Sequence, residues 1–238
     1  MAETVLTNSK IYFGSYDLTG HSNSVALETG ADLGDATTFG SSGWRERASG
    51  LKTASGRVGG YWDAATNLDP DDHIWSEIGA AREVLTICPT GGAAAAEAFS
   101  MRSVAGTYSF GGSVGDVAPF ELDFEASGEM FRGTVIATQT VNSTGGLTAY
   151  ELGAVAEGQS IYFVIHVTAL TGTITLKLES DSNENFLVSP EYQVEPDQFA
   201  AVGASWGSAA GEITDTWYRV NVTQVSDSAT IVAVAGIL

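Results

Sequence analysis

The side chains best suited to catalysis are scattered along this chain. The three histidines, His21, His73 and His166, lie far apart, and none has a second ligand at the spacing of a metal motif. No HExxH, nucleophile elbow or P-loop occurs, and the glycine-containing segments 40–43 and 203–211 hold no lysine to meet a phosphate. His166 lies in an apolar run, which favours a hydrogen-bonded strand histidine. The sequence therefore predicts a protein that is not an enzyme.

Two acidic segments offer oxygen ligands that calcium could use. Asp69, Asp71 and Asp72 surround Pro70. The N-terminus of a helix is a simpler explanation of these residues than a calcium site. Asp69 can cap the helix, Pro70 suits its first position, and the next two carboxylates complement its dipole. The segment Asp181-Ser182-Asn183-Glu184-Asn185 is interpreted as a polar turn before a calcium loop. We expect no metal site, no other cofactor site and no catalytic residue.

The elements that position these residues are mostly strands. Alternation with period two in segments 120–125 and 174–179 indicates half-buried strands. The β-branched and aromatic segment 160–167 is typical of a central strand that is covered on both faces. Many short strands with regular turns predict a sandwich or barrel. The turn residues that separate the runs are Gly111-Gly112, Gly145-Gly146 and Thr171-Gly172.

One short helix is expected near Pro70–Ala80, with an apolar face of Ile74, Trp75 and Ile78 that packs Trp75 onto a sheet. The single cysteine, Cys88, excludes an internal disulfide and is expected to be buried. The expected N-terminal core consists of Ile11, Phe13, Leu27, Trp62, Trp75, Ile78, Leu85, Ile87, Leu122 and Phe124.

We predict an all-β fold of two domains. Residues 1–137 hold the helix, residues 138–146 form a polar, turn-rich linker, and residues 147–238 form a C-terminal β-sandwich of immunoglobulin-like or jelly-roll type. No apolar run reaches the length of a membrane helix, and the first residues lack a secretory signal, so we expect synthesis in a cytoplasm and no membrane partner.

The charge balance disfavours nucleic-acid binding. The chain has 29 acidic and 10 basic residues, a net charge of −19, whereas binding to DNA depends on lysine and arginine that neutralise phosphates. The acidity serves either solubility through self-repulsion or a surface past which DNA moves without sticking.

The segment 30–59 is expected to be a long loop. It is rich in glycine, serine and threonine and holds four of the ten basic residues. Ordering such a loop costs about 1–2 kcal/mol per residue, which its apolar content does not offset, so we expect it to order on another copy of the chain. The residues expected to make this inter-subunit contact are Trp44, Arg45, Arg47, Leu51, Lys52 and Arg57.

The N-terminal segments form a recognisable succession. The opening 10–20, Lys-Ile-Tyr-Phe-Gly-Ser-Tyr-Asp-Leu-Thr-Gly, precedes a strand at 25–28 and a long loop that contains 35–40. Gly50-Leu51-Lys52, the strand entry Gly59-Gly60-Tyr61-Trp62-Asp63 and the helix follow. Over residues 1–137 this succession resembles the major tail tube proteins of long-tailed (siphovirus-type) bacteriophages.

The resemblance implies a tail-tube-like β-sandwich or barrel with one helix, whose copies form hexameric rings that stack into the tail tube of a virion. The long loop would reach the neighbouring ring, other tail proteins would be partners, and DNA would pass through during ejection without specific binding. The C-terminal half lies outside the resemblance. Two alternatives remain: a capsid decoration protein that trimerises on a shell, or a carbohydrate-binding module on an assembly domain, with Trp206, Trp217, Tyr192 and Phe199 as candidate sugar contacts.

Overall fold

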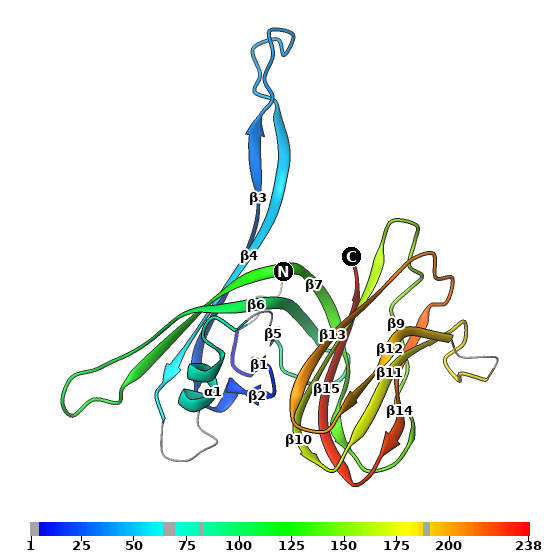
Figure 1. The fold of residues 1–238 in the computed structure, drawn as a ribbon. Coiled ribbons are helices and arrows are strands. Elements are labelled where there is room, and N and C mark those ends of the chain that lie inside the picture. The colour runs from blue at the N-terminus through cyan, green and yellow to red at the C-terminus, as the bar shows by residue number, and fades with distance from the viewer. Residues whose placement is uncertain (1–4, 64–69, 81–82, 188–190) are drawn as a thin grey trace. The chain divides into compact units, whose positions relative to one another are not determined.

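Antiparallel strands make up most of the structure (Figure 1). The computed structural model describes residues 5–63, 70–80, 83–187 and 191–238. The prediction of an all-β fold with one short helix is confirmed. The elements are β1 (Lys10–Phe13), β2 (Tyr16–Asp17), the 3-10 turn η1 (Leu18–Gly20), β3 (Ser22–Asp35), β4 (Arg47–Tyr61), α1 (Pro70–Glu77), β5 (Glu83–Cys88), β6 (Glu97–Phe110), β7 (Pro119–Val141), β8 (Gly145–Gly146), β9 (Tyr150–Glu151), β10 (Ser160–Thr171), β11 (Ile174–Asp181), β12 (Glu191–Phe199), β13 (Gly203–Ala210), β14 (Trp217–Val225) and β15 (Ser228–Ile237).

The chain divides into two compact units. We call them the sandwich unit, residues 1–20, 82–102 and 128–238, and the hairpin unit, residues 21–81 and 103–127. This division differs from the predicted domains 1–137 and 147–238. The predicted linker 138–146 is wrong in part, because β7 continues to Val141 and β8 occupies Gly145–Gly146. Threonines at 138 and 140 look turn-like in sequence, but they pair in register with Val232 and Thr230 of β15.

Two sheets enclose the main core of the sandwich unit. One contains β13, β10, β15 and the second half of β7, and the other contains β12, β11, β14 and β8, with β9 also paired to β14. Buried side chains from both sheets, among them Phe163, Leu176 and Tyr218, form one cluster. The opposite face of β10 and β15 is covered too, because Val164 and Val234 pack with Tyr12. The prediction of a strand covered on both faces is confirmed for β10.

His166 lies on this second face of β10 and is fully buried. Its Nδ1 is 2.7 Å from the carbonyl oxygen of Gly14, and its Nε2 is 2.8 Å from Thr86 Oγ1. A carbonyl can only accept, so Nδ1 donates to Gly14 and Nε2 accepts the Thr86 hydroxyl proton. Thr86 Oγ1 is then free to accept from the hydroxyl of Ser100, 2.9 Å away. Burial lowers the pKa of His166 to about 4, so the ring is neutral.

Most of the predicted N-terminal core is buried. Six of the ten residues are at most 3 % exposed: Ile11, Phe13, Leu85, Ile87, Leu122 and Phe124. Cys88 is also fully buried, as expected. Leu27 and Trp62 are half-buried.

The helix prediction is confirmed, but its buried face is different. Ile74 is fully buried, whereas Trp75 is 68 % exposed and Ile78 is 38 % exposed. The expected packing of Trp75 onto a sheet is therefore wrong, since α1 ends at Glu77 and its short length presents little more than one side chain to the sheet. Asp69, the expected cap, lies outside the described residues. Among the described residues, no helix is long and apolar enough to span a membrane.

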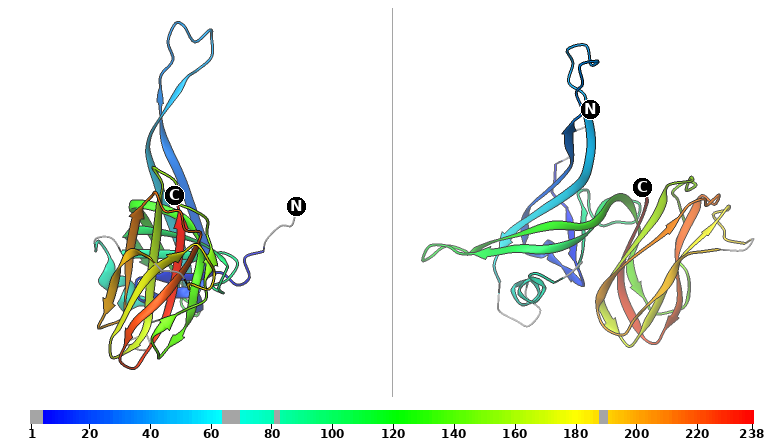
Figure 2. Two further views of the ribbon diagram at one scale, coloured as in Figure 1. Left: turned by 90° about the vertical axis from the view of Figure 1, so that its right-hand side faces the viewer. Right: turned by 45° about the horizontal axis from the view of Figure 1, so that its top comes forward.

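The hairpin unit is built on antiparallel pairing of β3 with β4 and of β4 with the first half of β7. The predicted loop 30–59 is wrong, because these residues form the end of β3, the turn that follows it and most of β4. Figures 1 and 2 show these strands as a long, narrow ribbon. The outer ribbon buries neither of its faces, so neither face needs apolar side chains. Its sequence therefore lacks the alternation of apolar and polar residues that indicates a strand.

Candidate assembly surface

The outer ribbon, β3 from residue 28 and β4 up to residue 53, is exposed on both faces. Its strands pair from Gly30, opposite Thr53, to Asp35, opposite Arg47. The register shifts once along this stretch, between Ala31 and Leu33. A two-stranded ribbon without a buried face is at best marginally stable in water. The sequence nevertheless extends it for several residue pairs, which suits a ribbon that packs on another molecule.

Internal hydrogen bonds define the turn at the tip of the ribbon. The N–H of Ala36 donates to the carbonyl of Glu46 at 2.9 Å, and the N–H of Glu46 donates to Thr37 Oγ1 at 3.0 Å. The N–H of Trp44 donates to the carbonyl of Ser41 at 3.0 Å. Glycine at 43 takes a φ of 86°, a conformation that favours glycine. The tip is thus locally structured before any partner is considered.

Large apolar side chains are concentrated on the hairpin unit. Among the described residues, fifteen large hydrophobic side chains are exposed, and ten of them belong to this unit, which is about a third of the chain. On the ribbon and its tip, Leu33 is 57 %, Phe39 112 %, Trp44 80 % and Leu51 78 % exposed. The other six are Tyr61, Trp75, Ile78, Phe110, Val114 and Val117. Burying a large apolar side chain contributes roughly 1.5–3 kcal/mol, so this surface favours association.

The basic residues of the ribbon have different surroundings. Arg45, Arg47 and Lys52 are exposed. Arg57 lies further in, and its Nε donates to Asp123 Oδ1 of β7 at 2.6 Å. Arg57 therefore already has a partner within its own chain, unlike the role predicted for it. Segment 30–59 contains four basic and three acidic residues, net +1, so the remaining chain carries −20.

One face of the inner sheet is acidic. Glu121, Asp123 and Glu125 alternate along β7 with buried apolar residues, and Glu28 of β3 lies across β4 from them. We call these four carboxylates the acidic face. Arg57 is the cation among them, and its ion pair with Asp123 raises its pKa, with Glu121 and Glu28 contributing.

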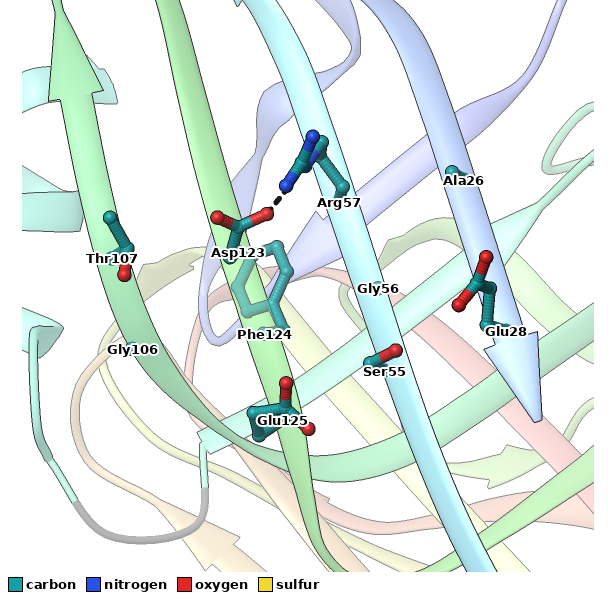
Figure 3. A pocket seen from close by; sticks show the side chains of 10 residues that line it. All are labelled: Ala26, Glu28, Ser55, Gly56, Arg57, Gly106, Thr107, Asp123, Phe124 and Glu125. Atoms are coloured by element: carbon teal, nitrogen blue, oxygen red, sulfur yellow. Dashed lines mark hydrogen bonds and ion pairs between the residues drawn. The ribbon is translucent and has the colours of Figure 1, made fainter. Parts of the chain in front are cut away.

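A shallow groove of about 460 Å³ crosses this face (Figure 3). It is hollow because the strands carry small residues there, among them Gly56 and Gly106. Figure 3 shows Arg57 directed at Asp123 between the strands, with Glu28 and Glu125 on either side of Ser55. The groove is lined by three carboxylates, one guanidinium and the hydroxyl groups of Ser55 and Thr107.

Asp71 has a structural role that the sequence did not reveal. Its Oδ1 accepts hydrogen bonds from Trp62 Nε1 at 2.8 Å and from the Tyr108 hydroxyl at 2.7 Å. Trp62 also stacks on Phe110 of β6, with ring centroids 5.2 Å apart. Asp71 thereby fastens α1 to β6, close to the turn that joins β6 to β7. This use of the carboxylate disfavours the calcium alternative for segment 69–72.

Two of the candidate sugar-binding aromatics in the sandwich unit are used in packing. Trp206 meets Phe131 and Tyr162 edge-on, with centroids 5.2 and 5.7 Å away. Phe199 packs against the main core. Trp217 is half-buried, and the side chain of Tyr192 lies outside the described part of the chain. These positions give the carbohydrate alternative no clear aromatic platform within the described residues.

Comparisons with known proteins give fold similarities alone. No protein-family model and no curated protein matches the sequence. A chain from the virion of a native gene transfer agent particle is 16 % identical, with a TM-score of 0.46 over 55 % of this chain and 98 % of that chain. The SPP1 tail tube protein is 11 % identical, with a TM-score of 0.44 over 55 % and 78 %.

The similarity to a third structure covers nearly the whole chain. The SPP1 Dit (gp 19.1) protein, described as a hub of the adsorption apparatus in phages that infect Gram-positive bacteria, is 10 % identical, with a TM-score of 0.38 over 97 % of this chain and 99 % of that chain. All three TM-scores are below 0.5 and all three identities are below 25 %. The chain is similar in fold to phage tail tube and hub proteins.

Proposed function

We propose that this chain is a structural protein of a phage-type tail, whose copies assemble into rings that stack as a tail tube. The observation that carries the proposal is the concentration of ten of the fifteen exposed large apolar side chains on the hairpin unit. These side chains lie on the ribbon and its tip, at the end of β4, at α1 and around the turn between β6 and β7, and each would bury apolar area against a neighbouring copy. The partner is a second copy of the chain.

The ribbon is the proposed contact between copies. Trp44 and Phe39 supply apolar area at the tip, Arg45 and Arg47 supply positive charge next to them, and Lys52 adds a charge further along β4. The rest of each chain carries −20, so a neighbouring copy attracts the ribbon electrostatically and the apolar residues then bury area. Arginine and tryptophan are also the residues that dominate binding energy at interfaces. Because the ribbon contacts a different surface of its neighbour, the interface is heterologous, as rings and stacks require.

The acidic face is the proposed lining of the channel through which DNA moves. Four carboxylates with one arginine, itself paired to Asp123, offer phosphates little cationic contact. A lining of this kind releases few counterions from DNA and so binds it weakly. Hexameric symmetry, contacts with other tail proteins, the passage of DNA at ejection and synthesis in the host cytoplasm belong to the same proposal.

Electron microscopy of the purified full-length protein tests the proposal. Tubes or stacked rings are expected. Single rings that never stack would indicate a hub at one end of a tail, trimers would favour the capsid decoration alternative, and a monomer at all accessible concentrations would refute self-assembly.

Substitution of the ribbon tests its role within the assembly. A triple variant, Arg45→Ser, Arg47→Ser and Lys52→Ser, should fold but not polymerise; Arg57 is retained because it pairs with Asp123. Trp44→Ser should have the same effect. Val202→Ser, which removes an exposed apolar side chain from the sandwich unit, is the matched control and should assemble normally. Normal assembly of the Trp44 and triple variants in physiological salt would show that the ribbon is not the stacking element.

A further inference from the structure

Four aromatic side chains gather where β4 ends, far from the tip of the ribbon. Trp62 follows β4 and stacks on Phe110 of β6, with ring centroids 5.2 Å apart. Trp62 and Tyr108 both donate hydrogen bonds to Asp71 in the first turn of α1. Trp75 comes one helical turn after Asp71, and a helical side chain covers the turn before it. We call Trp62, Trp75, Tyr108 and Phe110 the aromatic patch.

The aromatic patch lies on the opposite face of the sheet from the acidic face. The Tyr108 ring contacts Phe120, with centroids 6.1 Å apart. Phe120 is buried and alternates along β7 with Glu121 and Asp123 of the acidic face. The patch is incompletely covered, because Trp75 is 68 % exposed and Phe110 is 55 % exposed. It therefore presents aromatic surface on the side that the proposed channel lining leaves free.

The surroundings of the patch are acidic. Segments 61–81 and 103–127 hold five and four acidic residues, and neither holds a lysine or an arginine. Asp72 and Glu77 belong to α1 together with Trp75. The lysines and arginines of the hairpin unit all lie at the tip or on β4. Arginine binds aromatic faces by cation–π contacts and pairs with carboxylates, so the patch suits an aromatic side chain that arginines accompany.

The tip of the ribbon has this composition but cannot reach the patch of its own chain. Trp44 precedes β4 and is 80 % exposed, next to Arg45 and close to Arg47. Trp62 follows the other end of the same strand. The 15 residues of β4 span roughly 45 Å of extended chain. Figure 1 shows the tip and α1 at opposite ends of β4. Contact between the two surfaces therefore needs two copies of the chain.

We propose that the tip of one copy docks on the aromatic patch of the next, with Trp44 against Trp75 and with Arg45 and Arg47 facing Asp72 and Glu77. This contact rests on the proposed function and names the surface that the ribbon meets. Each copy carries one tip and one patch at opposite ends of a single strand. The contact is therefore heterologous and repeats from copy to copy, as growth of a stack requires.

An exchange of charge between the two surfaces tests this contact in the full-length chain. Arg45→Glu with Arg47→Glu should raise the critical concentration for assembly about tenfold or more, and Asp72→Arg with Glu77→Arg should do the same. A chain with all four substitutions should assemble nearly as well as the wild type. The matched control adds Glu157→Arg and Glu212→Arg, at exposed positions of the sandwich unit, to the Arg45 and Arg47 changes and should stay defective. A folded chain with all four substitutions that is not rescued, or an equal rescue by the control, overturns the contact.

Photo-crosslinking keeps the test decisive if the exchanged chain does not fold. Replacing Trp75 with p-benzoylphenylalanine keeps an aromatic ring at an exposed position. Irradiation of assemblies made from a mixture of isotope-labelled and unlabelled chains should join position 75 to residues 41–47 of another copy, as mass spectrometry would show. Tubes or rings in which position 75 is joined only to other segments would overturn this contact and leave the proposed function standing. A wild type that stays monomeric would refute the proposed function and the contact together.

Discussion

Replacing His166 with asparagine should remove a large part of the acid sensitivity of the fold. The ring is neutral when folded because burial lowers its pKa from 6.5 to about 4. In the unfolded chain His166 takes up a proton near its ordinary pKa, so falling pH favours unfolding. Its stabilising contribution is complete above pH 6.5 and is lost as the pH falls towards 4. The whole loss is roughly 3 kcal/mol at about 1.36 kcal/mol per pH unit, and about 2 kcal/mol of it falls between pH 7.5 and pH 5.

Urea unfolding of both proteins at pH 7.5 and pH 5 measures this effect. Asparagine can still donate towards the Gly14 carbonyl but leaves Thr86 without its acceptor, so His166→Asn should be less stable at pH 7.5 by about 1–3 kcal/mol. Between the two pH values it should lose about 2 kcal/mol less than wild type, since the carboxylates titrate alike in both. Equal losses in the two proteins would refute the buried neutral histidine and its chain of hydrogen bonds.

Three further measurements test other parts of the structure. Asp71→Ala should destabilise by roughly 2–3 kcal/mol, because it leaves the Trp62 and Tyr108 donors unpaired, and Asp71→Asn should cost less in the same urea titration. Glu179→Ala should cost about 3–5 kcal/mol by stranding the buried basic side chains beside it, and a loss below 1 kcal/mol would contradict the buried ion cluster. Burial raises the pKa of Cys88 to about 12, so iodoacetamide at pH 8 should label it only after unfolding, as mass spectrometry would show.

Strands that bury one or both faces could be predicted from the sequence, and strands that bury neither could not. The residue types of segments 120–125 and 160–167 indicate which of their side chains are buried, and both segments are strands in the structure. The ribbon has no such pattern, because nothing covers its outer half, and its glycines and serines look like a loop. Its pairing depends on backbone hydrogen bonds between β3 and β4, which leave no periodic pattern in the side chains.

The candidate site was predictable in its composition but not in its contacts. The sequence predicts Trp44, Arg45 and Lys52 at a contact surface, and all three are exposed, Trp44 and Arg45 at the tip of the ribbon and Lys52 further along β4. Its position in the sequence places Arg57 with the predicted contact residues. In β4, however, it forms an ion pair with Asp123, which is 66 residues away in the sequence. Pairing between strands that are distant in sequence decides such contacts, and a single sequence does not record the register.

The alternation of β7 ties the acidic face to the core beneath it. Phe120, Leu122 and Phe124 are each at most 1 % exposed, while the residues between and after them are acidic. If β7 shifted by one residue in its pairing register, its buried face and its acidic face would change places. The three large apolar side chains would then be exposed, at a cost of roughly 1.5–3 kcal/mol each. The core therefore fixes where the carboxylates point. In a ring of identical copies the same constraint would place the acidic face identically in every subunit, which a continuous channel lining requires.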